Sequence, residues 1–368
     1  MSGSATVPSD LVDDVVRRTR LIAAIPAPPL SEQRRAELVS GWWREITADV
    51  RVDDLHNVWA PLRRGSGAAI VVAAHLDTVF GPEVEHGVVE RDGLLWGPSV
   101  GDDSVAVAAL GALDSLLPDD VGRPVWLLAT IGEEGVGNLA GIRHALATAP
   151  TEIDAVIALE GNWLGRVCVT GVGSLRYRVE LAGPGGHAWE ASEVDSAVHA
   201  AARIVAALDR ADRPAGGRSS VNVGRIEGGQ AINVRAPHAS FDVDLRADTA
   251  AGLAELVAMF HHVVDAHRGD LTATRDVFGE RPAGRLDPQH PLALAAIHAL
   301  ALVGVAATLT AASTDANAVH AAGIPAIAIG ITVGAGEHTT EEWIDPSQID
   351  KGLLALAETI TGYVRRTS

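Results

Sequence analysis

Short apolar runs alternate with helix-like segments along the first 160 residues. Three runs rich in aliphatic residues and bounded by polar or glycine positions are typical of buried strands: residues 68–74, 125–131 and 153–159. Helical spacing of apolar groups occurs in four segments: residues 9–26, 31–48, 104–117 and 138–149. Strands and helices in alternation predict an α/β fold whose sheet is mixed but mostly parallel.

The pattern changes after about residue 173. Segments of strand and helix character then follow in the order β-α-β-β-α-β: residues 174–181, 195–210, 220–226, 239–246, 249–267 and 271–277. This order predicts a ferredoxin-like unit. From Pro291 the first pattern returns, with a helix to about residue 303, a strand at 326–331 and a helix at 347–365. We therefore expect one domain made of residues 1–174 and 279–368, interrupted by an inserted domain of residues 175–278.

Composition and charge limit the classes of partner. The 368 residues are 47% hydrophobic and 21% charged, as in a globular protein of about two domains. The net charge of −18 argues against a nucleic-acid partner and against an anionic membrane surface. No secretory signal or membrane-spanning run is visible, and the single cysteine, Cys168, excludes an intrachain disulfide and lies in an apolar, core-like run. We expect a cytoplasmic protein.

Acids and histidines gather where the predicted strands end. The segments concerned are His75-Leu-Asp77, Gly101-Asp-Asp103, Gly132-Glu-Glu-Gly135, Leu159-Glu-Gly161 and the late loop around His338. Ligands of open α/β sheets bind outside the carboxyl ends of the strands. Each segment alone could be a helix cap or a solvated acid. Together, imidazoles and carboxylates without thiolate predict a metal site, with zinc as the first choice and cobalt or manganese possible.

These motifs resemble those of the dinuclear-zinc peptidase and deacylase family that includes glutamate carboxypeptidase, acetylornithine deacetylase, succinyl-diaminopimelate desuccinylase and peptidase T. The likeness extends over essentially the whole chain, and the motifs occur in the family's order. The resemblance implies a hydrolase that uses two divalent metal ions, with zinc as the first choice, and a metal-bridging water to cut an amide bond in a small peptide or N-acyl amino acid. It also implies that residues 175–278 form a lid and dimerisation domain.

The resemblance implies roles for individual residues around the metals. The implied ligands are His75 and Glu160 for one ion, Glu134 and His338 for the other, and Asp102 as the bridge. Glu133 resembles the general base, and Asp77 resembles the partner that orients the first histidine. In the family, a cis peptide bond follows the bridging aspartate. Many members have Lys-Gly where this chain has Ser104-Val105, and proline where it has Gly161, so an unusual substrate preference is expected.

Three residues of the inserted domain also match the family. His187 resembles the histidine that reaches across a homodimer into the partner's active site, Asn233 resembles an asparagine near the substrate, and Arg246 resembles the arginine that binds a substrate carboxylate. A surface-loop histidine and a strand-end ion pair are the plainer interpretations of His187 and Arg246.

Several hypotheses remain open about the function. The same site could hydrolyse another C–N bond, for instance in the deamination of an amino aromatic acid. The chain could also be a catalytically silent relative that only binds, or a metal-free protein whose acids are caps. Because Glu133 and all five ligands are present, the sequence favours an active enzyme.

Overall fold

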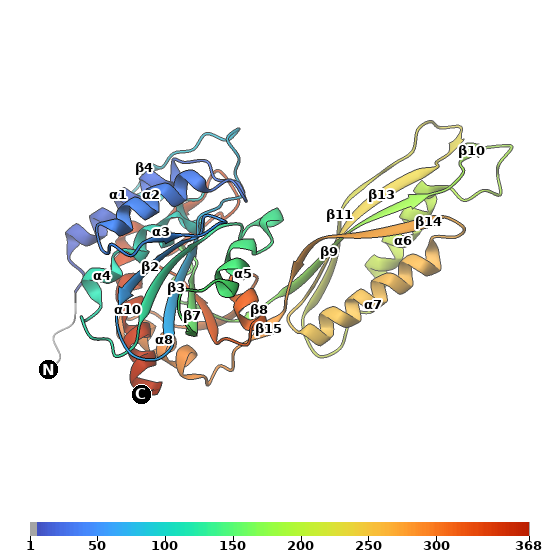
Figure 1. Cartoon of the computed structure of the whole chain (residues 1–368). Helices are drawn as coiled ribbons and strands as arrows, with labels where there is room; N and C mark the ends of the chain where they lie inside the picture. The colour runs from blue at the N-terminus through green and yellow to red at the C-terminus, as the bar shows by residue number, and fades with distance from the viewer. Residues whose placement is uncertain (1–5, 368) are drawn as a thin grey trace. The chain divides into compact units, whose positions relative to one another are not determined.

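The computed structural model describes residues 6–367 and divides into two compact units (Figure 1). The first unit holds the residues up to Thr170 and those from Arg285 onward, and the second unit is Gly171–Gly284. The hydrophobic pattern places the boundaries at 174/175 and 278/279. The boundaries of the structure lie further out because the first strand of the second unit begins at Gly173 and its last strand continues to Arg281, beyond the apolar positions that mark them in the sequence.

Within the described residues, the first unit is built on a nine-stranded sheet. Its order is β1 (Arg51–Val52), β2 (Val58–Arg63), β6 (Val125–Thr130), β3 (Ala69–His75), β7 (Ile153–Leu159), β17 (Ala326–Ile329), β8 (Arg166–Gly171) and β15 (Gly284–Arg285), with β16 (Thr308–Ala312) also paired to β8. Strands β6, β3, β7 and β17 are parallel to one another, whereas β1, β2 and β8 pair antiparallel. The structure confirms the expected mixed, mostly parallel sheet.

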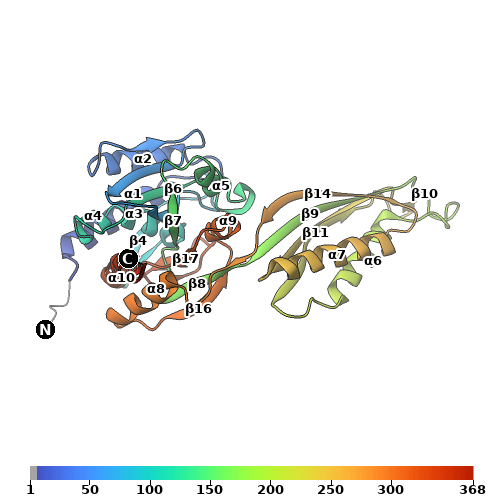
Figure 2. The ribbon, with the colours of Figure 1, turned by 60° about the horizontal axis from the view of Figure 1, so that its bottom comes forward.

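Helices cover both faces of this sheet. They are α1 (Ser9–Ala23), α2 (Gln33–Arg44), α3 (Val105–Leu110), α4 (Leu113–Leu116), α5 (Ala140–Ala147), α8 (Pro291–Leu302), α9 (Ala316–Ala321) and α10 (Ile349–Thr367). Alternate residues of β3 point to opposite faces of the sheet. Ile70 and Val72 pack in the core with α1, α3, α8 and α10, and Val71 packs on the other face with α5 and α9 (Figure 2). Because both faces are covered, all seven residues of β3 are buried, and those before His75 form an uninterrupted apolar run.

A small antiparallel sheet lies in the same unit and matters for the site. Its order is β18 (Gly334–Ala335), β19 (Trp343–Ile344), β5 (Leu94–Trp96) and β4 (Val89–Arg91). The loop between β18 and β19 carries His338, and β5 leads into the helical turn Val100–Ser104. The remaining single turns are Gly135–Gly137 and Pro346–Gln348.

The second unit has the ferredoxin-like order expected from the sequence. Its elements are β9 (Gly173–Ala182), β10 (Gly186–His187), α6 (Ala197–Arg210), β11 (Ser219–Gly228), β12 (Val234–Arg235), β13 (His238–Ala247), α7 (Ala250–His267) and β14 (Thr272–Arg281). Four antiparallel strands in the order β11-β13-β9-β14 form the sheet, and β10 and β12 form a separate short ribbon. Every second residue of β9 from Tyr177 is buried and packs in one core with α6 and α7.

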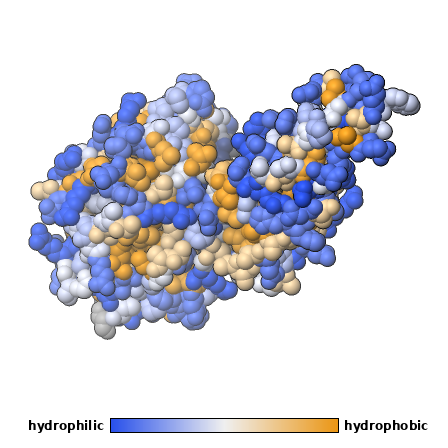
Figure 3. Space-filling model, turned by 45° about the vertical axis from the view of Figure 1, so that its right-hand side comes forward, coloured by the Kyte–Doolittle hydropathy of each residue, from blue (hydrophilic) through white to orange (hydrophobic). Residues whose placement is uncertain are grey.

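No helix among residues 6–367 has the length and apolar character needed to cross a membrane. On the face drawn in Figure 3, hydrophilic residues surround several hydrophobic patches.

Candidate metal centre

Neighbouring parallel strands bring the predicted site residues to one edge of the large sheet. His75 is the last residue of β3, Glu133 and Glu134 follow the end of β6, and Glu160 follows the end of β7. Since β6, β3 and β7 are adjacent and parallel, their carboxyl ends meet at this edge. Asp102 enters from the turn before α3, and His338 enters from the loop between β18 and β19.

Two groups of three donor residues share Asp102. His75, Asp102 and Glu160 form one group, and Asp102, Glu134 and His338 form the other; the ligand atoms within each group lie within 4.8 Å of one another. Asp102 Oδ1 is 2.9 Å from His75 Nε2, and its Oδ2 is 3.2 Å from His338 Nε2. The two oxygens of one carboxylate therefore face two different imidazoles, as a bridging ligand requires.

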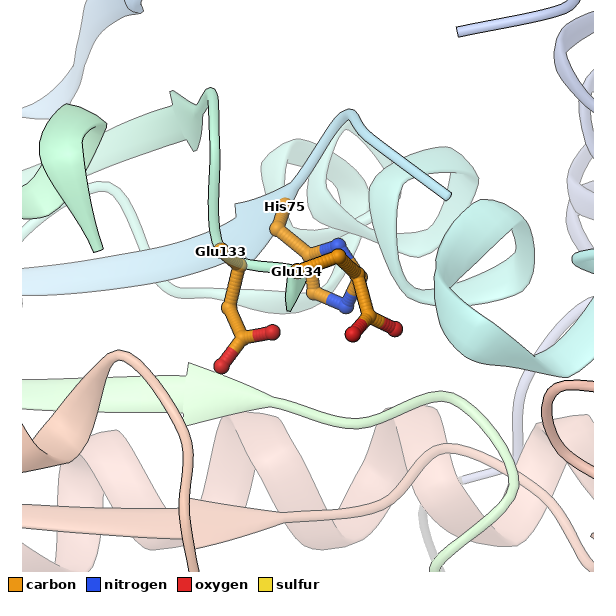
Figure 4. Close-up of side chains that lie close together, drawn as sticks. All are labelled: His75, Glu133 and Glu134. Carbon is orange, nitrogen blue, oxygen red and sulfur yellow. The ribbon is translucent and has the colours of Figure 1, made fainter. Parts of the chain in front are cut away.

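The two glutamates of the turn after β6 point in different directions. Figure 4 shows Glu134 directed to the side of the His75 ring and Glu133 directed away from it. Glu134 Oε1 lies 2.8 Å from His338 Nε2. His75, Glu133 and Glu134 nevertheless also place ligand atoms within 4.8 Å of one another. The distances alone therefore do not decide which of the two glutamates would contact an ion beside His75.

The donor set suits divalent cations. The members of both groups offer only imidazole nitrogen and carboxylate oxygen, which are ligands that zinc accepts. Burial raises the pKa of Glu134 above its usual value and that of Glu160 well above it, because a charged carboxylate loses its hydration there. A cation bound between these carboxylates would stabilise their charged form, as hydration does at an exposed position.

The histidine and aspartate between the groups show the opposite shifts. Burial lowers the pKa of His75, but hydrogen bonds to Asp102 and Asp77 outweigh it and raise that pKa well above its usual value. Burial alone would raise the pKa of Asp102. Hydrogen bonds from His338 and His75 outweigh burial and hold that pKa well below its usual range. Both shifts have the same cause, the close approach of Asp102 to the two imidazoles.

Asp77 holds the turn that carries both glutamates. Its Oδ1 accepts the backbone N–H of Glu133 at 2.9 Å, and its Oδ2 accepts that of Glu134 at 2.7 Å. His75 Nδ1 lies 3.1 Å from the backbone carbonyl of Asp77 and 3.4 Å from Asp77 Oδ1. Asp77 therefore contacts His75 as the resemblance implies, but its two best hydrogen bonds go to the Glu133–Glu134 backbone.

Other buried side chains hold the ligand-bearing backbone, and the sequence pattern gives no sign of them. Asn57 Oδ1 accepts the N–H of Ile131 at 3.0 Å, and Glu32 Oε1 accepts the N–H of Gly132 at 2.9 Å. With the bonds to Asp77, four consecutive N–H groups of this turn each meet a buried side-chain oxygen. Burial raises the pKa of Glu32 to about 7.

The peptide groups around Asp102 are held in the same way. Asp103 is fully buried; its Oδ2 accepts the N–H of His75 at 3.1 Å and its Oδ1 accepts that of Gly161 at 2.8 Å, so it joins the ends of β3 and β7. Glu342 Oε1 accepts the N–H groups of Gly101 at 2.7 Å and Asp102 at 2.6 Å. Burial raises the pKa of Glu342 to about 9. The peptide bond between Asp102 and Asp103 is cis, as it is after the bridging aspartate of the family.

Two departures from the family pattern lie against each other. A Cβ added at Gly161 would lie 2.3 Å from Val105 Cγ1 and 2.2 Å from the carbonyl oxygen of Gly101. Val105 is buried and occupies a position where many family members have glycine. Val105 therefore lies directly against Gly161, and a side chain at 161 would meet both Val105 and the backbone of Gly101.

The three candidate residues of the second unit do not all lie together. His187 and Val234 pair in the β10–β12 ribbon, and the N–H of Ala188 donates to the carbonyl of Asn233 at 2.9 Å. His187 and Asn233 are thus exposed neighbours. Arg246 lies near the other end of β13, opposite Ser174, about 25 Å along the strand from the end nearer the ribbon. Its Nε donates to Asp244 at 2.9 Å, which is the ion pair of the plainer interpretation.

Two curated relatives share part of the chain. A probable carboxypeptidase of Aspergillus flavus is 27% identical over 259 residues, which cover 63% of this chain and 60% of that protein. Acetylornithine deacetylase of Photorhabdus laumondii is 24% identical over 259 residues, covering 64% of this chain and 66% of the relative. The chain thus spans less than two thirds of the length of either relative.

Solved structures share the fold over nearly the full length. Aminopeptidase PepT from Bacillus cereus superposes with a TM-score of 0.80 at 19% identity, covering 96% of this chain and 98% of the other. The YXEP protein of Bacillus subtilis, described as a dinuclear metal binding peptidase, gives a TM-score of 0.72 at 17% identity with the same coverage. Residues 71–362, well over half of the chain, match Peptidase family M20/M25/M40. The chain therefore belongs to peptidase family M20/M25/M40.

Proposed function

We propose that this protein is a metal-dependent hydrolase that cuts the amide bond of a small peptide or an N-acyl amino acid. The observation that supports this most is the position of Asp102, whose two oxygens face His75 and His338 from two separate groups of donors. A carboxylate shared by two such groups is the ligand arrangement of a two-metal hydrolytic site. Relatives that are a probable carboxypeptidase and a deacetylase support the same class of reaction.

Five residues would hold two ions. His75 and Glu160 would hold one ion, Glu134 and His338 would hold the other, and Asp102 would be the ligand shared by both. Because no thiolate belongs to either group, zinc is the ion proposed, with cobalt or manganese as alternatives. When bound, such ions lower the pKa of water and polarise a carbonyl group.

Glu133 is proposed as the general base. It shares a turn with the ligand Glu134, but it belongs to neither of the two groups that contain Asp102, and its carboxylate is directed to another side (Figure 4). Glu133 accepts a proton from the attacking water and returns it to the leaving amine. Asp77 keeps the two glutamates in these different roles by binding both of their backbone N–H groups.

Residues of the second unit complete the proposed site in a homodimer. His187 donates a hydrogen bond to the developing oxyanion from the partner protomer, and Asn233 acts near the substrate. The exposed position of His187 beside Asn233 on one ribbon supports a joint role. Arg246 binds a substrate carboxylate through the Nη groups of its guanidinium, while its Nε donates to Asp244.

Metal content and turnover measured on one sample test this function. The purified protein is analysed for bound metals and then assayed against N-acyl amino acids, dipeptides and tripeptides, with and without added zinc, cobalt or manganese. About two ions per chain together with metal-dependent cleavage is the expected result. Two ions without cleavage of any amide would direct the search to other C–N bonds, and the absence of metal binding under all conditions would overturn the proposal.

A further inference from the structure

Glu342 is a buried acid with an unusual set of contacts. Its exposed fraction is 0%, although it neighbours the exposed Glu341. Its Oε1 accepts both backbone bonds described above, from Gly101 and Asp102, whereas its Oε2 is buried without a hydrogen-bond partner among the described residues. Burying a carboxyl group with one unpaired oxygen costs free energy, so packing alone gives no reason for an acid at this position.

Glu342 lies where three ligand-bearing segments meet. It belongs to the same loop as His338, and it binds the backbone of Asp102. A Cβ added at Gly101 would lie 2.8 Å from Glu342 Oε1 and 3.0 Å from Asn162, the second residue after Glu160. Glycine at 101 is therefore the residue that lets Glu342 and the loop after Glu160 approach the same peptide group.

The two bonds from Glu342 act on the residue that the site depends on most. Asp102 is the one residue shared by both donor groups, and its oxygens must face His75 and His338 at the same time. Its backbone lies in an irregular turn whose dihedral angles at Asp102 and Asp103 are not helical, so regular hydrogen bonding does not hold it. Glu342 supplies the missing acceptor and ties this turn to the His338 loop.

We propose that Glu342 is a positioning residue that fixes Asp102 in its bridging orientation and keeps the His338 loop in register with it. The inference rests on the proposed two-metal function and adds to it a residue that touches neither metal nor substrate. Replacing Glu342 should therefore lower the affinity of the site for metal ions. Side chains that support ligands in this way typically change metal affinity about 10- to 100-fold when removed.

Metal titration of three variants tests the proposal. Glu342→Ala removes the acceptor, Glu342→Gln keeps an acceptor oxygen in place, and Glu341→Ala is the matched control, since Glu341 is exposed and its ion pair with Arg91 is 3.5 Å long. Full-length protein is stripped of metal and titrated with cobalt(II), whose absorption bands report ligand geometry. We expect Glu342→Ala to lose about 10- to 100-fold in affinity and to show altered bands, with Glu342→Gln and Glu341→Ala close to the wild type.

The outcomes separate this inference from the proposed function. If the wild-type chain fails to bind two ions, the proposed function fails. If the wild type binds two ions and Glu342→Ala binds them with the same affinity and the same spectrum, only the role of Glu342 is refuted. The role would also be refuted if Glu342→Gln lost as much cobalt affinity as Glu342→Ala, because the glutamine amide retains an acceptor oxygen. Should Glu342→Ala not fold, Gly101→Ala replaces it, because the added Cβ would lie 2.8 Å from Glu342 Oε1. Cobalt affinity and absorption bands that stay unchanged in Gly101→Ala would then refute the role of Glu342.

Discussion

The change Asp77→Asn tests whether buried side chains, and not the sheet alone, hold the turn that carries Glu133 and Glu134. Asp77 is fully buried, and its two oxygens accept the N–H groups of Glu133 and Glu134. A hydrogen bond to a charged group contributes about 1.5–3 kcal/mol, and a buried donor left unpaired costs about 1–3 kcal/mol. Asparagine keeps one acceptor oxygen but turns its NH₂ group toward the other N–H. We therefore expect the metal-free protein to lose about 2–4 kcal/mol of unfolding free energy and metal affinity to fall about 10- to 100-fold.

Urea unfolding of the metal-free protein and a zinc titration measure the two effects. Asp345→Asn is the matched control: Asp345 Oδ1 also accepts two hydrogen bonds, from Ser347 N at 2.9 Å and Ser347 Oγ at 2.6 Å, but both are exposed and neither involves a candidate ligand. Because its two hydrogen bonds are exposed to solvent, that control should stay within about 0.5 kcal/mol of the wild type. A similarly small effect for Asp77→Asn, with zinc affinity unchanged, would refute the view that Asp77 positions the two glutamates.

Three further outcomes follow from the same site. Glu133→Gln should abolish turnover while two ions stay bound; loss of the metal as well would mean that Glu133, not Glu134, is the ligand. His187→Ala should lower kcat about 10²- to 10³-fold, the size of one oxyanion donor, and an unchanged kcat would refute that assignment. The pKa values of Glu32 and Glu342 are raised from 4.5 to about 7 and about 9, so the folded metal-free chain binds more protons than the unfolded chain within this range. Its stability should fall as the pH rises from 5 to 9, and a rising Tm of EDTA-treated protein would contradict this.

The sequence predicts the elements whose signal is local. Apolar runs mark β3, β6 and β7 to within a residue, because strands buried on both faces need little else. The βαββαβ order of the second unit follows from the same periodicities. The ligand candidates are recognisable because glycine and acid residues at the ends of parallel strands meet at one edge whatever the details of packing.

Other features depend on contacts that no local pattern encodes. Strands β4, β18 and β19 have two or three residues, which is too short for a period to show. Strand β8 is an apolar run that the sequence assigns to the core but not to a strand. Asn57, Glu32 and Glu342 resemble ordinary polar residues, and their hydrogen-bond partners lie 74, 100 and more than 200 positions away. Only the folded chain shows what these residues do.

The same physical need connects the supporting acids with the proposed metal ions. Where parallel strands end, the hydrogen bonds between strands end too, and the buried N–H groups of the following turns require other acceptors within the protein. Asp77, Asp103, Glu32 and Glu342 provide them, but each adds a carboxyl group to an edge that already holds four acidic candidates for metal binding and catalysis. Arg35 lies fully buried among them, donating to the carbonyl of Leu76 at 3.0 Å and to Ser99 Oγ at 3.0 Å. One guanidinium group cannot balance so many acids. Protons can do so in the metal-free chain, and divalent cations would do so without neutralising the acceptors that hold the turns.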